Sequence, residues 1–308
     1  MAGFSENSGM MEIDIKAAAC IAAALSALSV FAVGESEMDA VYTVPHELDC
    51  LIKSGHIQGA CCSEQGVYLS HARGLDKIGW DGKLIKHIDV PSHLGDSAFS
   101  RGRVYGVFTI RDPKQRKDGK CGLVRVWDEN LNPLDEAWFE ESLDGITVLG
   151  DTIYVGIDRW GYDPHSECGV KRLGLDLSDR GNTDIPLSHP INYGVQTMSN
   201  DGKNLFFGLY GAPADKGNPK RLNCARLTPD LKLQESFRFD FGCSEGFDRV
   251  PVSLAKRDTP VFFAVRAMGG NMQGWRKDPV NNPPRIRLEF YGYVDGAFRF
   301  ITRKPLKN

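Results

Sequence analysis

The sequence predicts an all-β fold, and three observations lead to that prediction. The chain has 308 residues, and its 33 glycines cluster where short strands would need turns. A unit of paired short strands recurs five times along the chain, with a spacing of about 37 to 56 residues that is typical of repeat proteins built from small sheets. After residue 34 there is no extended apolar pattern of helical period, apart from one short turn at Pro45–Ile52.

Each repeat unit begins with a head of small and apolar residues. A polar turn follows the head, and then a strong apolar pair such as Val67-Tyr68 or Val104-Tyr105. Polar or small residues flank most of these pairs, as expected for strands packed on both faces. The heads are IQGACC (Ile57–Cys62), LGDSAF (Leu94–Phe99), LDGITV (Leu143–Val148), YGVQTM (Tyr193–Met198) and VPVSLA (Val250–Ala255).

A second hairpin completes every unit. In the first unit, Asp81-Gly82 lies between apolar residues at Ile78 and Leu84, which is a strong hairpin signal. The corresponding pairs of segments in the other units are 124–128 with 134–139, 170–175 with 185–187, 225–230 with 237–239, and 288–293 with 298–300. Five such units predict a five-bladed β-propeller with four-stranded antiparallel blades. A β-sandwich is the alternative, but it would not repeat one four-stranded unit five times.

From about His56 to Ile301 the sequence resembles the β-propeller superfamily, and the resemblance rests on the repeat itself. Five-bladed members include secreted arabinan- and fructan-cleaving enzymes, a calcium-dependent nucleotidase and a sugar-binding lectin. The chain carries the motifs of none of these. It also resembles uncharacterised exported propeller proteins, and that resemblance implies no activity.

Residues 1–34 have the pattern of a signal peptide. Lys16 precedes an uncharged run from Ala17 to Val33, and small residues at Ala32 and Gly34 fit a cleavage site. A buried alanine-rich helix is the alternative. We therefore expect a secreted or periplasmic protein with a lead-in segment at 35–55, a single propeller domain at 56–308 and no membrane span in the mature chain. The segment Val41–Val44 either pairs at the edge of a blade or covers the ring.

Charge and cysteine usage exclude several function classes. The net charge is -3 and neither half is strongly basic, so no nucleic-acid partner is indicated. The eight cysteines form no CxxC motif, which argues against a zinc ribbon or a thioredoxin-like site. Adjacent Cys61 and Cys62 would point to opposite faces of a strand, and we expect most cysteines to be small buried hydrophobic residues. The sequence also lacks a GxSxG elbow, a P-loop, an HExxH motif and a Rossmann fingerprint.

One face of the predicted propeller gathers the polar residues. The blade heads and the long loops between second and third strands share this face, which we call the top face; four of these five loops are long, an asymmetry that suggests function. We expect these side chains to converge on a polar ligand there. The heads contribute His56, Gln58, His93, Asp96, Asp144, Tyr193, Gln196 and Asp248, and the roots of the loops contribute His71, Arg73, Arg111, Asp158, Arg159, Trp160, Tyr210 and Arg266.

Three head carboxylates suggest acid–base chemistry. Asp96, Asp144 and Asp248 come from different blades, and two carboxylates across an axis can cleave a glycosidic bond, with His93 assisting. The alternative is that each caps backbone amides in its own turn. A divalent cation in the central channel is a further hypothesis, although the spacing of His56, His71, His93 and Asp96 matches no zinc motif.

Three functions remain open at this point. The first is binding of a small polar, carbohydrate-like ligand in the pocket of the top face, where Trp160 and Tyr210 would stack on a sugar ring. The second is a glycan-active hydrolase or lyase that uses the head carboxylates. The third is a protein-interaction scaffold, because fold alone does not choose among such functions.

Overall fold

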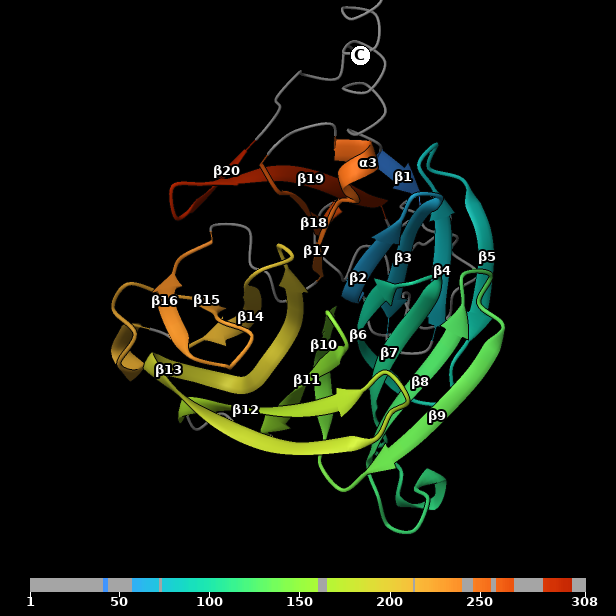
Figure 1. Ribbon diagram of the computed structural model, residues 1–308, viewed down its shortest axis with the longest axis horizontal. Coiled ribbons are helices and arrows are strands. Elements are labelled where there is room, and N and C mark those ends of the chain that lie inside the picture. Colours follow the sequence, from blue (N-terminus) through green and yellow to red (C-terminus); the bar gives the residue numbers. More distant parts are fainter. Residues whose placement is uncertain are drawn as a thin grey trace, which may run out of the picture. The chain divides into compact units, whose positions relative to one another are not determined.

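The computed structural model describes residues 41–43, 57–71, 74–159, 165–212, 214–239, 246–255, 259–268 and 285–300, which all belong to the compact unit Asp39–Asn308. These residues form antiparallel sheets with very little helix, and the predicted five-bladed β-propeller is confirmed (Figure 1). No helix among them is long and apolar enough to cross a membrane. The signal peptide predicted at 1–34 lies outside the described residues and stays a prediction.

The first two blades are separate four-stranded sheets in simple sequential order. The strands become more exposed from the axis to the rim. In blade one, β2 (Ile57–Ser63) and β3 (Gly66–His71) are buried along their whole length, whereas the outermost strands β5 (Leu84–Asp89) and β9 (Pro133–Phe139) of the two blades are largely exposed. A short 3-10 helix, η1 (Pro113–Gln115), lies in the loop after the second strand of blade two. The strands are β2 (Ile57–Ser63), β3 (Gly66–His71), β4 (Gly74–Gly79) and β5 (Leu84–Asp89) in blade one, and β6 (His93–Ser100), β7 (Arg103–Thr109), β8 (Gly122–Asp128) and β9 (Pro133–Phe139) in blade two.

Blades three and four share one long strand. The sequence predicts separate strands at 185–187 and 193–198, but the structure has the continuous strand β13 (Asp179–Asn200), the outermost of blade three and the innermost of blade four (Figure 1). Residues 188–192 contain no glycine turn, and Pro190 fixes a φ compatible with extended backbone. The other elements are β10 (Leu143–Leu149), β11 (Thr152–Arg159), β12 (His165–Gly174), β14 (Leu205–Gly211), η2 (Ala214–Lys216), β15 (Cys224–Leu227) and β16 (Leu233–Phe237).

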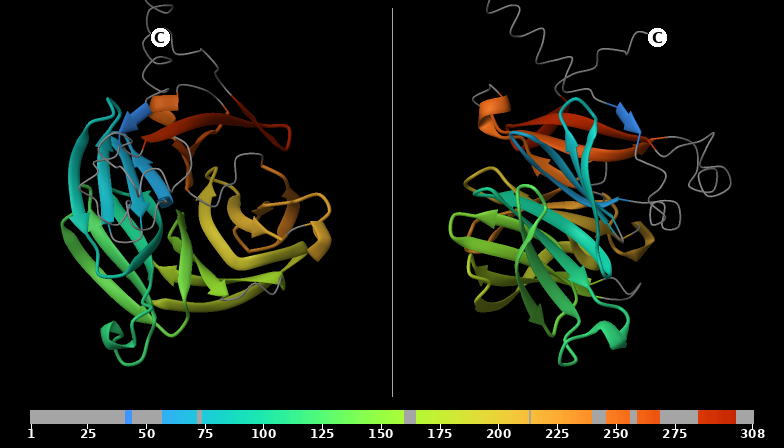
Figure 2. Two further views of the ribbon diagram at one scale, coloured as in Figure 1. Left: turned by 180° about the vertical axis from the view of Figure 1, so that it is seen from behind. Right: turned by 90° about the vertical axis from the view of Figure 1, so that its right-hand side faces the viewer.

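Blade five has a composite outer edge. Its strands are β17 (Phe247–Arg249), β18 (Val261–Met268), β19 (Arg285–Val294) and β20 (Ala297–Phe300). The strand β1 (Val41–Thr43) pairs with β19 at residues 285–287, while β20 pairs with the same strand at residues 291–294 (Figure 2). Of the two roles left open for Val41–Val44, the structure therefore shows edge pairing, which covers part of an exposed sheet edge.

The fifth head is a correction to the sequence analysis. The innermost strand of blade five is Phe247–Arg249, and the predicted head at Val250–Ala255 instead contains one helical turn, α3 (Val252–Ala255). Pro251 explains the difference, because a proline has no N–H for a strand ladder but suits the start of a helical turn. The Pro251 carbonyl accepts the backbone N–H groups of Leu254 and Ala255.

The blades pack against one another around a closed ring. The innermost strands contact each other in the cycle β2, β6, β10, β13, β17 and back to β2. The apolar core lies between blades, since each core cluster contains residues of two neighbouring blades. Between blades four and five, the Phe206 ring lies 5.3 Å from that of Phe262, 4.9 Å from that of Tyr293 and 5.6 Å from that of Phe298, measured between centroids.

Replacing Phe206 tests this interface. Phe206 is fully buried, so Phe206→Ala should lower the free energy of unfolding by about 3–5 kcal/mol through lost burial and an unfilled cavity. Leu84→Ala on the exposed edge strand is the control and should change it by less than about 0.5 kcal/mol. Guanidinium unfolding measures both, and equal effects of the two substitutions would contradict an inter-blade core at Phe206.

Candidate functional site

Four of the five innermost strands contain a bulge within the predicted head. In β2, Gln58 is an extra residue between the pairs Ile57–His71 and Gly59–Ser70. The same kind of register shift occurs in the other three strands, at residues 95–96 of β6, residues 144–145 of β10, and residues 193–194 and 196 of β13. A bulge turns a side chain out of the regular alternation of the strand. The bulges therefore let Gln58, Asp144, Tyr193 and Gln196 leave the regular alternation of their strands.

The bulged ends line a cavity of about 310 Å³. Its walls come from all of the first four blades, so no single blade contains the site. Asp144, Gln58 and Gln196 are almost fully buried, with 8%, 9% and 7% of their surface exposed. The lining residues are Gln58, His93, Thr109, Arg111, Leu143, Asp144, Asp158, Tyr193, Gln196 and Tyr210, and we call this cavity the axial pocket.

Tyr193 has a strained backbone. Its φ of 62° lies in the left-handed region, which is rare for a bulky residue and occurs preferentially at functional sites. Its ring meets the Tyr210 ring edge-on, with 5.7 Å between centroids. The Gln196 side-chain amide donates to the Tyr193 carbonyl over 3.4 Å. The bulge of β13 thus sets an aromatic pair and an amide side by side in the pocket wall.

Two carboxyl groups in the pocket have pKa values above their usual range. Burial raises the pKa of Asp144 well above its usual range, the charge of Asp158 raises it further, and Arg111 opposes both effects. Burial also raises the pKa of Asp158 to about 6, again opposed by Arg111. Because a protonated carboxyl donates a hydrogen bond and an ionised one only accepts, this pair can present both functions to a ligand.

Hydrogen bonds at the start of β10 fix the position of this pair. The Asp158 backbone N–H donates to the Ser142 carbonyl over 2.8 Å. The Thr109 hydroxyl donates to the Leu143 carbonyl over 2.9 Å and lies 3.0 Å from the Ser142 hydroxyl. Strands from blades two and three are thereby tied together directly beside Asp144.

Asp96 lies outside the axial pocket. It is fully buried, and its Oδ2 accepts the backbone N–H groups of Met198 at 2.8 Å and Ile146 at 3.3 Å, from blades four and three. Burial raises the pKa of Asp96 well above its usual range, despite the bond from Met198. Gly59 of blade one packs against this carboxyl where a Cβ would clash, as Gly95 does against Asp144. Asp96 therefore caps backbone amides, including those of two other blades.

Asp248 lies at the opposite end of the innermost strands. It accepts the Ser199 hydroxyl at 2.8 Å and the Cys62 backbone N–H at 3.3 Å. Burial raises the pKa of Asp248 to about 7, although the bond from Ser199 lowers it. This carboxyl lines a second cavity, of about 570 Å³, beside the turns that follow the heads. The structure does not bring Asp96, Asp144 and Asp248 into one cavity: Asp144 lines the axial pocket, Asp248 lines the second cavity and Asp96 lines neither. Besides burial, the charge of Asp248 does raise the pKa of Asp96.

Two residues of the expected loop-root ring also lie elsewhere. Arg159 forms ion pairs with Glu167 and Asp184, both at 2.6 Å. His71 is fully buried in blade one, 3.4 Å from Asp76, which also contacts His87 at 2.6 Å. Among the described residues, this trio is the group whose geometry could hold a metal ion, and it lies in blade one rather than in the axial pocket.

Four of the predicted site residues have no described side chain. His56, Arg73 and Trp160 lie outside the described residues, as does the side chain of Arg266. Most of the loop 267–285, whose position would bear on the scaffold hypothesis, also lies outside them. Thr109 and Leu143 were not predicted to line the pocket, and Arg111 and Asp158 were placed in the ring without a chemical role. Thr109, Arg111 and Asp158 lie at or next to the end of a second strand, and Leu143 begins the head of blade three, so their place on the same face as the heads was the available signal.

Four of the described cysteines, Cys61, Cys62, Cys121 and Cys168, are free thiols. Cys61, Cys62, Cys168 and Cys224 are buried, and Cys121 is half-buried. Cys61 belongs to the apolar cluster between blades one and two, as expected for a small hydrophobic residue.

Comparisons with known proteins support the fold. The sequence matches no family model and no curated protein. The structure is similar to the GH43_1 enzyme from Xanthomonas citri complexed with xylose, with a TM-score of 0.51 and 12% identity over 87% of this chain and 95% of that chain. It is also similar to the Pan2 WD40 domain of Neurospora crassa, with a TM-score of 0.42 and 10% identity over 67% of this chain and 58% of that chain. At 12% identity the similarity to the GH43_1 enzyme shows a shared fold alone.

Substitutions at Asp96 test its structural role. Asp96→Ala leaves two buried amides without an acceptor and should lower the free energy of unfolding by about 2–4 kcal/mol. Asp96→Asn keeps an acceptor oxygen and resembles the neutral carboxyl, so it should stay within about 1 kcal/mol of the wild type at pH 7. Denaturant unfolding compares the two variants. A loss as large in Asp96→Asn as in Asp96→Ala would show that the negative charge is required.

The raised pKa of Asp158 predicts a pH-dependent stability. The folded protein binds its proton up to about pH 6, whereas the unfolded chain loses it near the ordinary value of 3.8. The associated stability is therefore present below pH 4 and lost as the pH rises through 6. Asp158→Asn should gain about 1–2 kcal/mol relative to the wild type between pH 4 and pH 7.5, allowing for partial exposure.

Unfolding of Asp158→Asn at both pH values measures this gain. Asp151→Asn, on the exposed turn between β10 and β11, is the matched control. A pH-independent difference between Asp158→Asn and the wild type would contradict a raised pKa of Asp158 in the folded protein.

Proposed function

We propose that this propeller binds a small polar, carbohydrate-like ligand in the axial pocket. The observation that carries the proposal is that two carboxyl groups with raised pKa values, Asp144 and Asp158, line one cavity with the buried amides of Gln58 and Gln196. Sugar hydroxyls both donate and accept hydrogen bonds. Carboxyl and amide groups that converge from several blades can satisfy both functions at once.

The aromatic pair supports a ring-shaped ligand. Tyr193 and Tyr210 are half-buried, so their rings offer apolar surface to the C–H groups of a sugar while their hydroxyls are suited to polar contacts. The cavity of about 310 Å³ lies at the lower end of the usual range for ligand pockets. This size favours a small ligand over a polymer segment lying across the whole face.

Binding measurements with variants of one pocket residue test the proposal. Gln196→Leu removes a buried amide, and the sugar hydroxyls it faced would be left unpaired, so affinity should fall by about tenfold or more. Gln65→Leu is the matched control, because Gln65 lines the cavity at the opposite end of the strands. We expect titration calorimetry with a panel of mono- and disaccharides to show binding by the wild type and by Gln65→Leu.

Two outcomes would contradict the proposal. One is that the wild type binds no member of the panel. The other is that Gln65→Leu abolishes binding while Gln196→Leu retains it, which would move the ligand to the cavity on the opposite side.

Glycosidic hydrolysis is the second candidate, and the raised pKa values of Asp144 and Asp158 favour it. Asp144, kept protonated by burial, would donate a proton to the glycosidic oxygen. Asp158, ionised near neutral pH, would activate water or attack the anomeric carbon. This pair takes the place of the head carboxylates Asp96 and Asp248, which bind backbone and hydroxyl groups of other blades.

Turnover separates the two candidates. If the site hydrolyses glycosides, Asp144→Asn should lower kcat by about a hundredfold or more on a substrate it still binds, because general acid catalysis contributes that much. Hydrolysis of a panel of aryl glycosides measures it. Binding without turnover in the wild type would leave the binding function and exclude the hydrolase for these substrates.

A further inference from the structure

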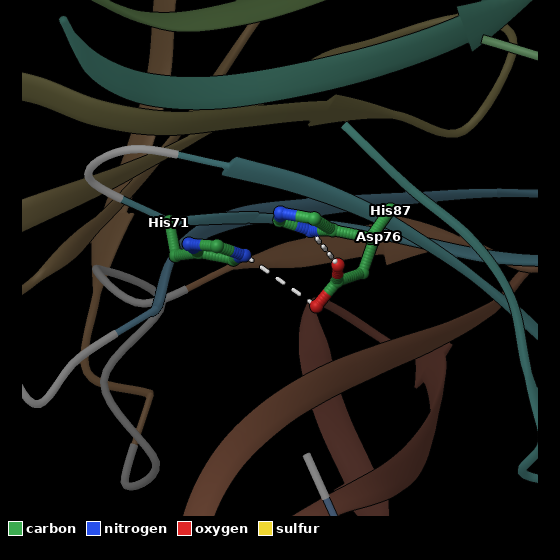
Figure 3. A group of neighbouring side chains, drawn as sticks. All are labelled: His71, Asp76 and His87. Atoms are coloured by element: carbon green, nitrogen blue, oxygen red, sulfur yellow. Dashed lines mark hydrogen bonds and ion pairs between the residues drawn. The ribbon is translucent and has the colours of Figure 1, made fainter. Parts of the chain in front are cut away.

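Blade one brings three metal-binding side chains onto one face of its sheet. Asp76 on β4 pairs directly with His87 on β5, and His71 on β3 pairs with Gly74, two residues before Asp76. Residues two apart on a strand, and residues paired across strands, share a face. His71, Asp76 and His87 therefore form a continuous cluster across three adjacent strands (Figure 3).

Gly74 makes room for this cluster. A Cβ at Gly74 would collide with the rings of both His71 and His87. The two imidazoles lie nearly parallel, at 3° with 6.0 Å between centroids, over the space that this glycine leaves open. Any other residue at this position would force the rings apart, so the strand sequence provides for their approach.

The candidate ligand atoms lie within reach of one ion. His71 Nε2, the Asp76 carboxylate and His87 can each offer an atom within 4.8 Å of the others. The distance of 3.4 Å from His71 Nε2 to Asp76 Oδ2 is close to the ligand–ligand separation of about 3.4 Å in a tetrahedral zinc site with bonds of about 2.0–2.1 Å. His87 Nδ1 lies 2.6 Å from Asp76 Oδ1, so an ion would displace the hydrogen bond there.

Two further features are typical of a metal site. Asp76 is fully buried, yet its Oδ2 accepts no hydrogen bond of normal geometry from the described residues, although buried carboxylate oxygens normally have such partners. The exposed Asp89 lies 3.4 Å from His87 Nε2, the ring nitrogen that faces away from Asp76. A carboxylate in that position orients a metal-binding histidine and fixes its tautomer.

We propose that His71, Asp76 and His87 bind a divalent transition-metal ion of the zinc class. Two imidazoles and one carboxylate suit such an ion better than they suit Mg²⁺ or Ca²⁺, which prefer oxygen ligands. The ion would tie β3 and β4 to the edge strand β5, whose other long edge pairs with no described strand. Its effect would therefore be to stabilise blade one, separately from the axial pocket.

Zinc titration of the chelator-treated full chain tests the site. His87→Gln removes one ligand from a side chain that is 24% exposed, so the variant should still fold. His165→Gln, a half-buried histidine of β12, is the matched control. We expect the wild type and His165→Gln to bind Zn²⁺ and to gain about 5 °C or more in Tm at a hundredfold excess over Kd. His87→Gln should bind at least about a hundredfold more weakly and lose the gain in Tm.

A second variant keeps the test decisive. Asp89→Asn alters only an exposed neighbour of His87 and should weaken Zn²⁺ binding by about 10–100-fold without changing the Tm of the metal-free protein. Equal Zn²⁺ affinity and equal Tm gain in the wild type and His87→Gln would overturn the proposal. So would a wild type that binds no Zn²⁺, which would leave the trio as a hydrogen-bonded structural cluster.

Discussion

The hydrogen bonds that buried carboxyl groups make between blades hold the centre of this molecule together. Asp96 of blade two accepts amides of blades three and four, and Asp248 of blade five accepts groups of blades one and four. A buried amide without an acceptor is costly, so each bond fixes the relative position of two or three innermost strands. The axial pocket depends on these bonds, because its walls come from four blades and keep their spacing only if the ring does.

Bulges connect the fold to the site. In a regular strand the side chains point alternately toward the two neighbouring blades, so none of them points into the axial pocket. The register shifts at Gln58, Asp144 and Tyr193 interrupt this alternation and allow side chains to face the pocket. The strain at Tyr193 and the desolvation of Asp144 are compensated by the packing and hydrogen bonding of the surrounding ring, as is common at functional sites.

The sequence predicted the repeat, the top face and most of the pocket wall, since Gln58, His93, Asp144, Tyr193, Gln196 and Tyr210 do line one cavity. It could not predict which head side chains would face the pocket. A one-residue shift within a bulged strand decides whether an aspartate such as Asp96 contacts solvent or backbone amides. Likewise, His71, Asp76 and His87 become neighbours only through the pairing register of three strands. The fifth head was misplaced because its small and apolar residues resembled the others, although Pro251 forbids the strand.

The composite edge of blade five has a consequence for how the molecule is made. During synthesis β1 emerges before the five blades, whereas its partner β19 emerges near the end. β1 therefore stays unpaired while the strands of the first four blades can already pair with one another. The closing contact between β17 and β2 likewise joins distant parts of the chain. Contacts of such long range slow folding, and an incomplete ring would expose strand edges that can pair with other chains. The formation of blade five is therefore the folding step at which closure of the ring competes with aggregation.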